Sequence, residues 1–136
     1  ARSLAIWHEM IAARSFDRLA SITAEGVLFR SPAFFNPYPG KEALGIVLSA
    51  AMTVFEDFAY HRILAGPDGH DVMLEFSAHI GGTRLKGIDL IRFDSAGHIV
   101  EFEVMVRPLN GLTALAKAMA ERAGPRLKAL MGQGAR

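Results

Sequence analysis

The sequence predicts an α+β fold in which helices from the first half cover one face of an antiparallel sheet formed by the second half. Two observations predict it. Apolar residues recur at helical spacing near the start, as at Leu4, Trp7 and Ile11. From Glu56 onward the character of the chain changes, and four strand-like runs follow one another with only short turns between them, as in a meander.

The first half is expected to contain three helices and one strand. Residues 3–14 form an amphipathic helix, and SFDRLASIT continues as a second short helix with Ser15 as its N-cap. The segment EGVLFRS is a short strand that stops at Pro32. The loop SPAFFNPYPG carries three prolines and three aromatic residues, so we expect it to pack over another part of the molecule. Gly40 then opens a helix through Val54, whose apolar stripe is Leu44, Val47, Leu48 and Ala51.

The second half is expected to form four strands and a last helix. Gly81-Gly82 is a two-residue hairpin signal in which both glycines supply a positive φ, and DSAG is a tight turn. The last helix runs from about Leu109 and weakens at Gly124-Pro125. Strands are expected over residues 56–65, 71–80, 83–94 and 98–108, and the last helix turns Leu112, Leu115, Ala116 and Met119 inward.

Composition indicates a single globular domain over residues 1–136, with residues 124–136 as a frayed tail. Hydrophobic residues make up 51% and charged residues 21%, and the net charge of +1 gives no electrostatic case for nucleic acid or an acidic membrane. There is no cysteine, no apolar run that would span a membrane and no signal-peptide core in ARSLAIWHEM. We therefore expect a cytoplasmic protein without nucleic acid or membrane partners.

One residue departs from the strand pattern. Within GIDLIRF, alternation places Asp89 on the same face as Gly87 and Ile91, although strands disfavour Asp and a buried carboxylate is costly unless paired. The register follows from the hairpin, because pairing Ile80 with Thr83 sets Leu74 opposite Asp89. The predicted inward face also includes Phe76, Ala78, Leu85, Phe102, Val104 and Val106, and the outward face Glu75, Ser77, His79, Arg84, Lys86, Glu101 and Glu103.

This order of elements, with GKEAL opening a helix and the run G-x-D-x-x-R-F-D-x-x-G-x-I in the meander, resembles the nuclear transport factor 2-like superfamily. Within it, the chain is similar to the SnoaL-like and ketosteroid-isomerase-like branch from Leu4 to Met119. The resemblance implies a cystatin-like α+β roll, in which a curved antiparallel sheet wraps round the N-terminal helices as a cone with an apolar pocket inside. Members include isomerases, polyketide cyclases, epoxide hydrolases and non-catalytic binding modules.

The resemblance to ketosteroid isomerase also implies roles for individual positions. Asp89 falls at the position of the protonated Asp that stabilises the enolate, whereas Ser31 falls at the general base and Trp7 at the oxyanion Tyr. A serine does not abstract a carbon-bound proton at neutral pH, and the supporting Tyr positions fall at Thr23 and Leu48. Because only one of these polar positions, Asp89, is intact, the sequence argues against ketosteroid isomerase activity.

Two readings of Asp89 stay open. It is either a general acid or hydrogen-bond donor to a ligand carbonyl, with a pKa raised by burial, or a structural carboxylate held by Trp7 Nε1, a buried His or a backbone amide. His8 is the candidate base near it. No His pair has metal-ligand spacing, so we expect no metal and no cofactor. The candidate ligand-binding residues are Trp7, Ser31, Phe34, Tyr38, Phe76, Gly87, Phe102 and Val104, with Gly87 leaving room for a ligand atom.

Two function classes follow. The first is a SnoaL-like enzyme that performs cofactor-free acid–base chemistry of the isomerase, cyclase or hydrolase type on an apolar carbonyl compound, with Asp89 as its acid. The second is a non-catalytic module that binds a small apolar molecule or a partner. We also expect a homodimer, because the outward sheet face mixes Ile88, Leu90 and Met105 with charged residues.

Overall fold

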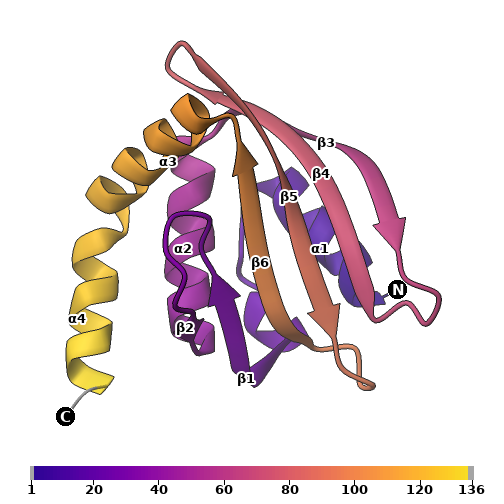
Figure 1. The fold of residues 1–136 in the computed structure, drawn as a ribbon. Coiled ribbons are helices and arrows are strands. Elements are labelled where there is room, and N and C mark those ends of the chain that lie inside the picture. The colour runs from indigo at the N-terminus through magenta and orange to yellow at the C-terminus, as the bar shows by residue number, and fades with distance from the viewer. Residues whose placement is uncertain (1, 135–136) are drawn as a thin grey trace.

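The computed structural model describes residues 2–134, with side chains through Leu130, as a curved six-stranded sheet with helices packed on one face (Figure 1). The helices are α1 (Arg2–Ala13), the 3-10 turn η1 (Leu19–Ile22), α2 (Lys41–Val54), α3 (Leu109–Arg122) and α4 (Gly124–Gly134). The strands are β1 (Thr23–Arg30), β2 (Tyr38–Pro39), β3 (Glu56–Ala65), β4 (Asp71–Ile80), β5 (Thr83–Phe93) and β6 (Ile99–Arg107). Over the described residues, none of the helices combines the length and hydropathy that a bilayer crossing requires.

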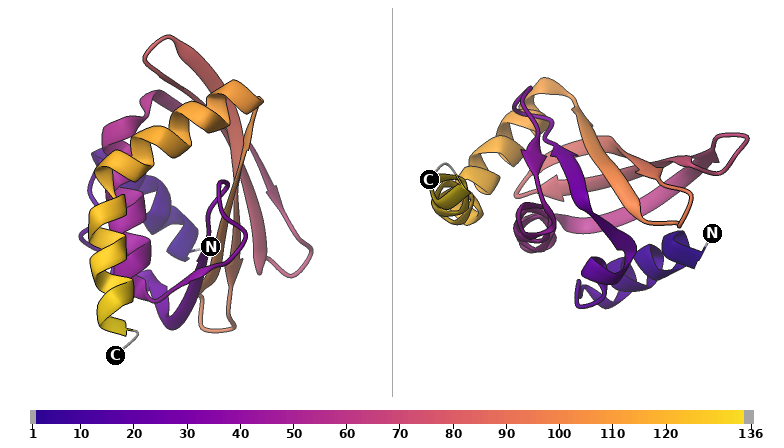
Figure 2. Two further views of the ribbon diagram at one scale, coloured as in Figure 1. Left: turned by 60° about the vertical axis from the view of Figure 1, so that its left-hand side comes forward. Right: turned by 90° about the horizontal axis from the view of Figure 1, so that it is seen from below.

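The sheet has the order β2-β1-β6-β5-β4-β3 and is open at both edges. Strands β3 to β6 form the expected antiparallel meander, and the α+β cone is confirmed. The expected sheet is wrong in one respect, because β1 pairs with β6 in parallel and the sheet is therefore mixed. β1 occupies the edge that the meander leaves unpaired, and β2 extends the sheet beyond it. Figure 2 shows the sheet curving around α1 and α2.

The predicted register of the β4–β5 hairpin is confirmed. Ile80 lies opposite Thr83, and Leu74 lies opposite Asp89, with no bulge between these pairs. The expectation that both turn glycines have positive φ is wrong, because only Gly81 does, at φ +58°. A hairpin turn with positive φ at its first central residue alone still matches the right-handed twist of the strands, so the register is unaffected.

The core lies between the inner face of the sheet and the helices. The largest side chains with almost no exposure come from α1, α2 and strands β1, β4, β5 and β6. The ring centroid of Trp7, on α1, lies 5.1 Å from that of Phe102. Alternation therefore delivers the apolar residues of β4, β5 and β6 to one side, as the sequence predicted. These fully buried side chains are Trp7, Phe76, Phe102, Leu44, Leu74, Ile91, Ile99 and Val27.

Two helical predictions differ from the structure. No helix starts at Ser15, because α1 ends at Ala13, Arg14 turns the chain with φ +54°, and only the short turn η1 follows. The break predicted at Gly124-Pro125 is present between α3 and α4, but the segment expected as a frayed tail is helical over Gly124–Gly134. Leu127 and Leu130 pack against the cluster formed by Ala123 with Ile46 and Ala50 of α2, and this burial explains the helix.

Gly87 of β5 gives a test of this packing. A Cβ at this position would meet the carbonyl oxygen of Met105 and lie 2.6 Å from Cζ of Phe76. We expect Gly87→Ala to destabilise the fold by about 1–3 kcal/mol, the usual cost of overpacking. Gly45→Ala, in α2, should instead gain up to about 1 kcal/mol, because apart from the backbone of its own helix nothing would crowd the new Cβ. Urea unfolding measures both, and equal stability of Gly87→Ala and wild type would contradict this packing.

Candidate functional site

A cavity of about 350 Å³ lies between the inner face of the sheet and α1, α2 and α3. Its wall is apolar and rich in aromatic rings, and it is closed on one side by the loop that follows β1. Among the described residues, the polar or ionisable side chains on this wall are few. They are Trp7, Ser31, Tyr38, Tyr60, Asp89 and Lys128.

Asp89 lies on this wall, in the middle of β5, with 6% of its surface exposed. The hydroxyl of Tyr60, on β3, donates a hydrogen bond of 2.6 Å to Asp89 Oδ2. The Nε1–H of Trp7, on α1, donates to the Tyr60 hydroxyl oxygen at 3.0 Å. Among residues 2–134, no hydrogen bond satisfies Asp89 Oδ1, so this oxygen is the one available to a ligand.

Burial determines the protonation of this pair. Burial raises the pKa of Asp89 from 3.8 to about 7, and the hydrogen bond from Tyr60 acts in the opposite direction. Burial, and then the charge of Asp89, raise the pKa of Tyr60 above its ordinary value. Tyr60 therefore stays a neutral phenol that donates to Asp89, and the raised pKa makes the protonated form of Asp89 accessible near neutral pH. A neutral carboxylic acid in an apolar cavity can donate a hydrogen bond to a carbonyl oxygen.

The structure brings most of the predicted site residues to one cavity. Phe76 and Val104 lie on the sheet wall with Asp89, and Trp7 lies on the helical wall. The loop after β1 contributes Ser31 and Phe34 to the wall, and Tyr38 of β2 lies there as well. Phe34 and Phe35 are 65% and 94% exposed, so they do not pack into the cavity as the sequence led us to expect, whereas the ring of Tyr38 stacks on that of Phe29.

Three predicted residues do not lie on the cavity wall. Phe102 is fully buried against Trp7 in the core. Gly87 leaves no room for a ligand atom, because the ring of Phe76 already occupies the space beside it. His8 lies outside the cavity wall, and its ring packs edge-on against that of Tyr60 with centroids 5.6 Å apart. Its Nε2 is buried and has no hydrogen-bond partner among the described residues.

Sequence reasoning missed Tyr60, which is the direct partner of Asp89. The run EDFAYHRILA predicts the strand, but β3 pairs with β4 through register shifts between Glu56 and Ala59 and between Tyr60 and Ile63. A bulge reverses which residues face inward, so alternation alone does not orient this strand. The signal that remained was the aromatic pair Phe58 and Tyr60, two residues apart, which both line the cavity.

Within the described part of the chain, no group of three or more His, Cys, Asp or Glu residues is arranged to hold a metal ion.

The curved α+β cone is the fold of a known class of proteins. The family model described as the SnoaL-like domain matches residues 5–102, and the chain belongs to this family. No curated protein sequence matches the chain significantly.

Solved structures agree with the family. A steroid delta-isomerase from Pseudomonas aeruginosa is 49% identical with a TM-score of 0.87, over 97% of this chain and 93% of that one. A bacterial protein of cystatin-like fold from Silicibacter pomeroyi is 32% identical with a TM-score of 0.82, over 88% and 84% of the two chains. An epoxide hydrolase/cyclase-like enzyme of pyran ring formation in salinomycin shares the fold at 17% identity and a TM-score of 0.65, over 81% and 91%.

The pH dependence of stability tests the buried carboxyl group. Since the pKa of Asp89 is raised in the folded state, the unfolded chain releases this proton first, and the free energy of unfolding falls as pH rises from 3.8 to about 7. Each pH unit in this window is worth about 1.4 kcal/mol, so wild type should lose roughly 4 kcal/mol relative to Asp89→Asn. Urea unfolding at several pH values measures this difference. A gain of stability by wild type over this window would identify Asp89 as an ionised, paired carboxylate.

Proposed function

We propose that this protein performs cofactor-free acid–base chemistry on an apolar carbonyl compound, with Asp89 as the acid. The observation that carries the proposal is a buried carboxyl group on the wall of an apolar cavity, with one oxygen held by Tyr60 and the other facing the cavity. In this position the protonated acid donates a hydrogen bond to the substrate carbonyl oxygen. It stabilises the negative charge that develops there when an enolate forms.

The similarity to a steroid delta-isomerase supports the reaction type. Moving a double bond next to a ketone passes through an enolate, and ketosteroid isomerase is the established case of a buried neutral Asp that stabilises one. A pKa of about 7 for Asp89 is consistent with a donor that works near neutral pH. The cavity volume of about 350 Å³ is at the lower end of the range for small-molecule sites.

An isomerase also needs a base that takes the carbon-bound proton. Ser31 lies on the cavity wall at the position where the resemblance expects that base, and its Oγ accepts the N–H of Ala33. Among the described residues, no carboxyl group besides Asp89, and no His, lies on the wall. This absence favours a second candidate function, a non-catalytic module that binds the same class of apolar carbonyl compound through Asp89.

Activity and its pH dependence test the role of Asp89. With a β,γ-unsaturated ketosteroid as substrate, kcat/KM should fall as pH rises through about 7, where Asp89 loses its proton. Tyr60→Phe removes the hydrogen bond that lowers this pKa, so the fall should move to higher pH. Asp89→Leu should lower kcat/KM about 100-fold, the usual cost of losing such a donor.

A matched control is Asp94→Asn, in the turn between β5 and β6 and away from the cavity, which should leave kcat/KM unchanged. Equal activity of wild type and Asp89→Leu would exclude Asp89 as the acid. Binding of the ketosteroid without turnover, lost in Asp89→Leu, would establish the non-catalytic module instead.

We also propose a homodimer through the outer sheet face. Leu64 and Met105 are 56% and 44% exposed there, and Met73, Ile88 and Leu90 are half-buried beside them. Glu75 is already paired within the chain, to Arg62 at 2.7 Å and Lys86 at 2.8 Å. Arg84 and Glu103 have no ion-pair partner among residues 2–134, so they are available to pair across a two-fold axis. The lack of cysteine leads us to expect this dimer in the reducing cytoplasm.

The dimer is tested by placing a charge in this apolar face. Met105→Glu should shift the protein from dimer to monomer in sedimentation velocity at micromolar concentration, because an unpaired charge in a buried interface is costly. Lys117→Glu, an exposed charge change on α3, is the control and should keep the dimer. Wild type that sediments only as a monomer would rule out this dimer.

A further inference from the structure

The lining of the cavity extends along α3 and α4. Leu112, Ala116 and Ala120 are spaced four apart and lie on one side of α3, and Gly124 and Lys128 do the same on α4. Leu112 and Ala116 are half-buried, whereas Ala120 and Lys128 are exposed. Ala116, Ala120 and Gly124 have small side chains, so little side-chain volume lies along this strip of lining residues between Leu112 and Lys128.

The outer end of this strip of lining residues, at Lys128, is positively charged. Lys128 is the cation on the cavity wall, and among residues 2–134 no carboxylate lies within ion-pair distance of it. Helix α4 carries Arg126 as well and has no acidic residue in its sequence, GPRLKALMGQG. A cation at the rim of an apolar cavity favours a ligand with negative charge at that end, because field lines are focused by the low-dielectric wall.

The two ends of the cavity therefore differ in what they accept. Asp89 at the inner end disfavours a negative group on the ligand. When Asp89 is ionised it repels an anion, and when it is protonated it donates a hydrogen bond to a carbonyl oxygen. Lys128 at the outer end accepts one. Lys128 is exposed, and a lysine at the edge of an apolar surface usually lays its stem along that surface and keeps its ammonium in water.

We propose that the ligand of this cavity is an apolar carbonyl compound with an anionic group at its far end, which binds with the carbonyl at Asp89 and the anion at Lys128. This inference rests on the proposed function, because it names the class of molecule that the same site takes. It makes Lys128 a specificity-determining residue that discriminates between acids and their esters.

The test uses a matched pair of compounds. One is a steroid carboxylic acid with its ketone on ring A and its carboxylate on ring D, and the other is its methyl ester. By titration calorimetry at about pH 6, where Asp89 is mostly protonated and the free acid is ionised, wild type should bind the acid about threefold to fivefold more tightly. At about 1 M salt, where the Debye length falls to about 3 Å, this preference should disappear.

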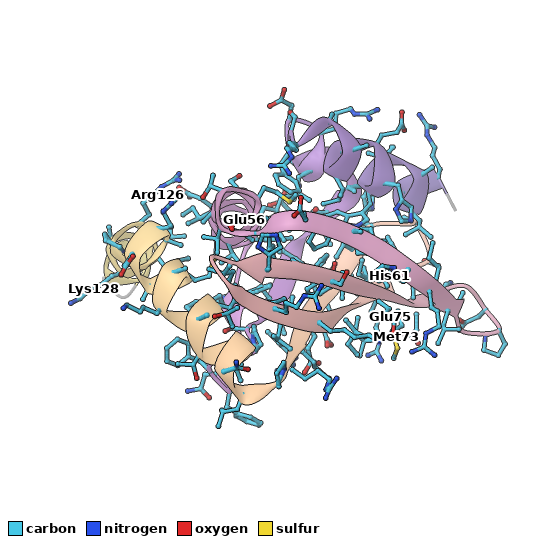
Figure 3. All side chains as sticks on the ribbon, turned by 90° about the horizontal axis from the view of Figure 1, so that it is seen from above. Glu56, His61, Met73, Glu75, Arg126 and Lys128 are labelled. Atoms are coloured by element: carbon cyan, nitrogen blue, oxygen red, sulfur yellow. The ribbon has the colours of Figure 1, made fainter. Side chains whose placement is uncertain are left out.

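Lys128→Gln should abolish the preference for the acid and leave the affinity for the ester unchanged. Arg126→Gln is the matched control, because residues two apart on a helix point about 200° apart, and it should keep the preference. Figure 3 shows both side chains reaching from α4 into solvent on different sides of the helix. Both variants lie at exposed positions, so neither substitution disturbs the core.

The outcomes separate the two proposals. Equal affinity of wild type for acid and ester, or a preference that survives in Lys128→Gln, overturns the role of Lys128. If Asp89→Leu still weakens the binding of both compounds in that case, the proposed function stands without a role for Lys128. Binding of neither compound to wild type overturns both the proposed ligand class and the proposed function.

Discussion

The burial of one carboxyl group constrains the rest of this structure. An unpaired charge in an apolar interior costs far more than one hydrogen bond returns, so Asp89 has to be neutral, partnered or both. Its partner Tyr60 is held in turn by the indole N–H of Trp7. These three side chains come from α1, β3 and β5, so the chain of hydrogen bonds ties the first helix to the middle and the edge of the sheet. Removing Tyr60 would leave both the carboxyl group and the indole donor without their partners, and a buried donor or acceptor without its partner costs about 1–3 kcal/mol.

The shape of the sheet makes this arrangement accessible to a ligand. β3 pairs with β4 through two register shifts, and Phe58 and Tyr60 of this irregular strand both line the cavity. On β5, the absence of a side chain at Gly87 lets the ring of Phe76, on the neighbouring strand β4, approach the backbone. The rings of Phe58 and Phe76 then stack with centroids 5.1 Å apart and form an apolar wall next to the carboxyl group. The raised pKa of Asp89 is thus a consequence of how aromatic residues are fitted around it.

The sequence predicted the parts of the fold that local rules determine. Alternation and the glycine turn fixed the β4–β5 register, so the inward position of Asp89 followed without a structure. The β3 register was out of reach, because a bulge leaves no signature in the alternation of EDFAYHRILA, and Tyr60 was therefore overlooked. Gly87 was misread because the sequence does not tell whether a ligand or a neighbouring ring fills the space beside a glycine. The parallel pairing of β1 with β6 joins segments far apart in the chain, which no local pattern records.

Two opposed effects act on the same carboxyl group, and their balance is informative about its role. Burial alone favours the protonated form, whereas the hydrogen bond from Tyr60 favours the ionised form, and the resulting pKa is about 7. A purely structural carboxylate would be expected to have more donors and a depressed pKa, as Glu75 does on the outer face, where Arg62 and Lys86 both hold it. Asp89 has a single protein donor, and its second oxygen faces a cavity large enough for a small molecule. A group that remains near its titration point at neutral pH, with one oxygen fixed and one available, is suited to donate or accept a proton when a ligand arrives.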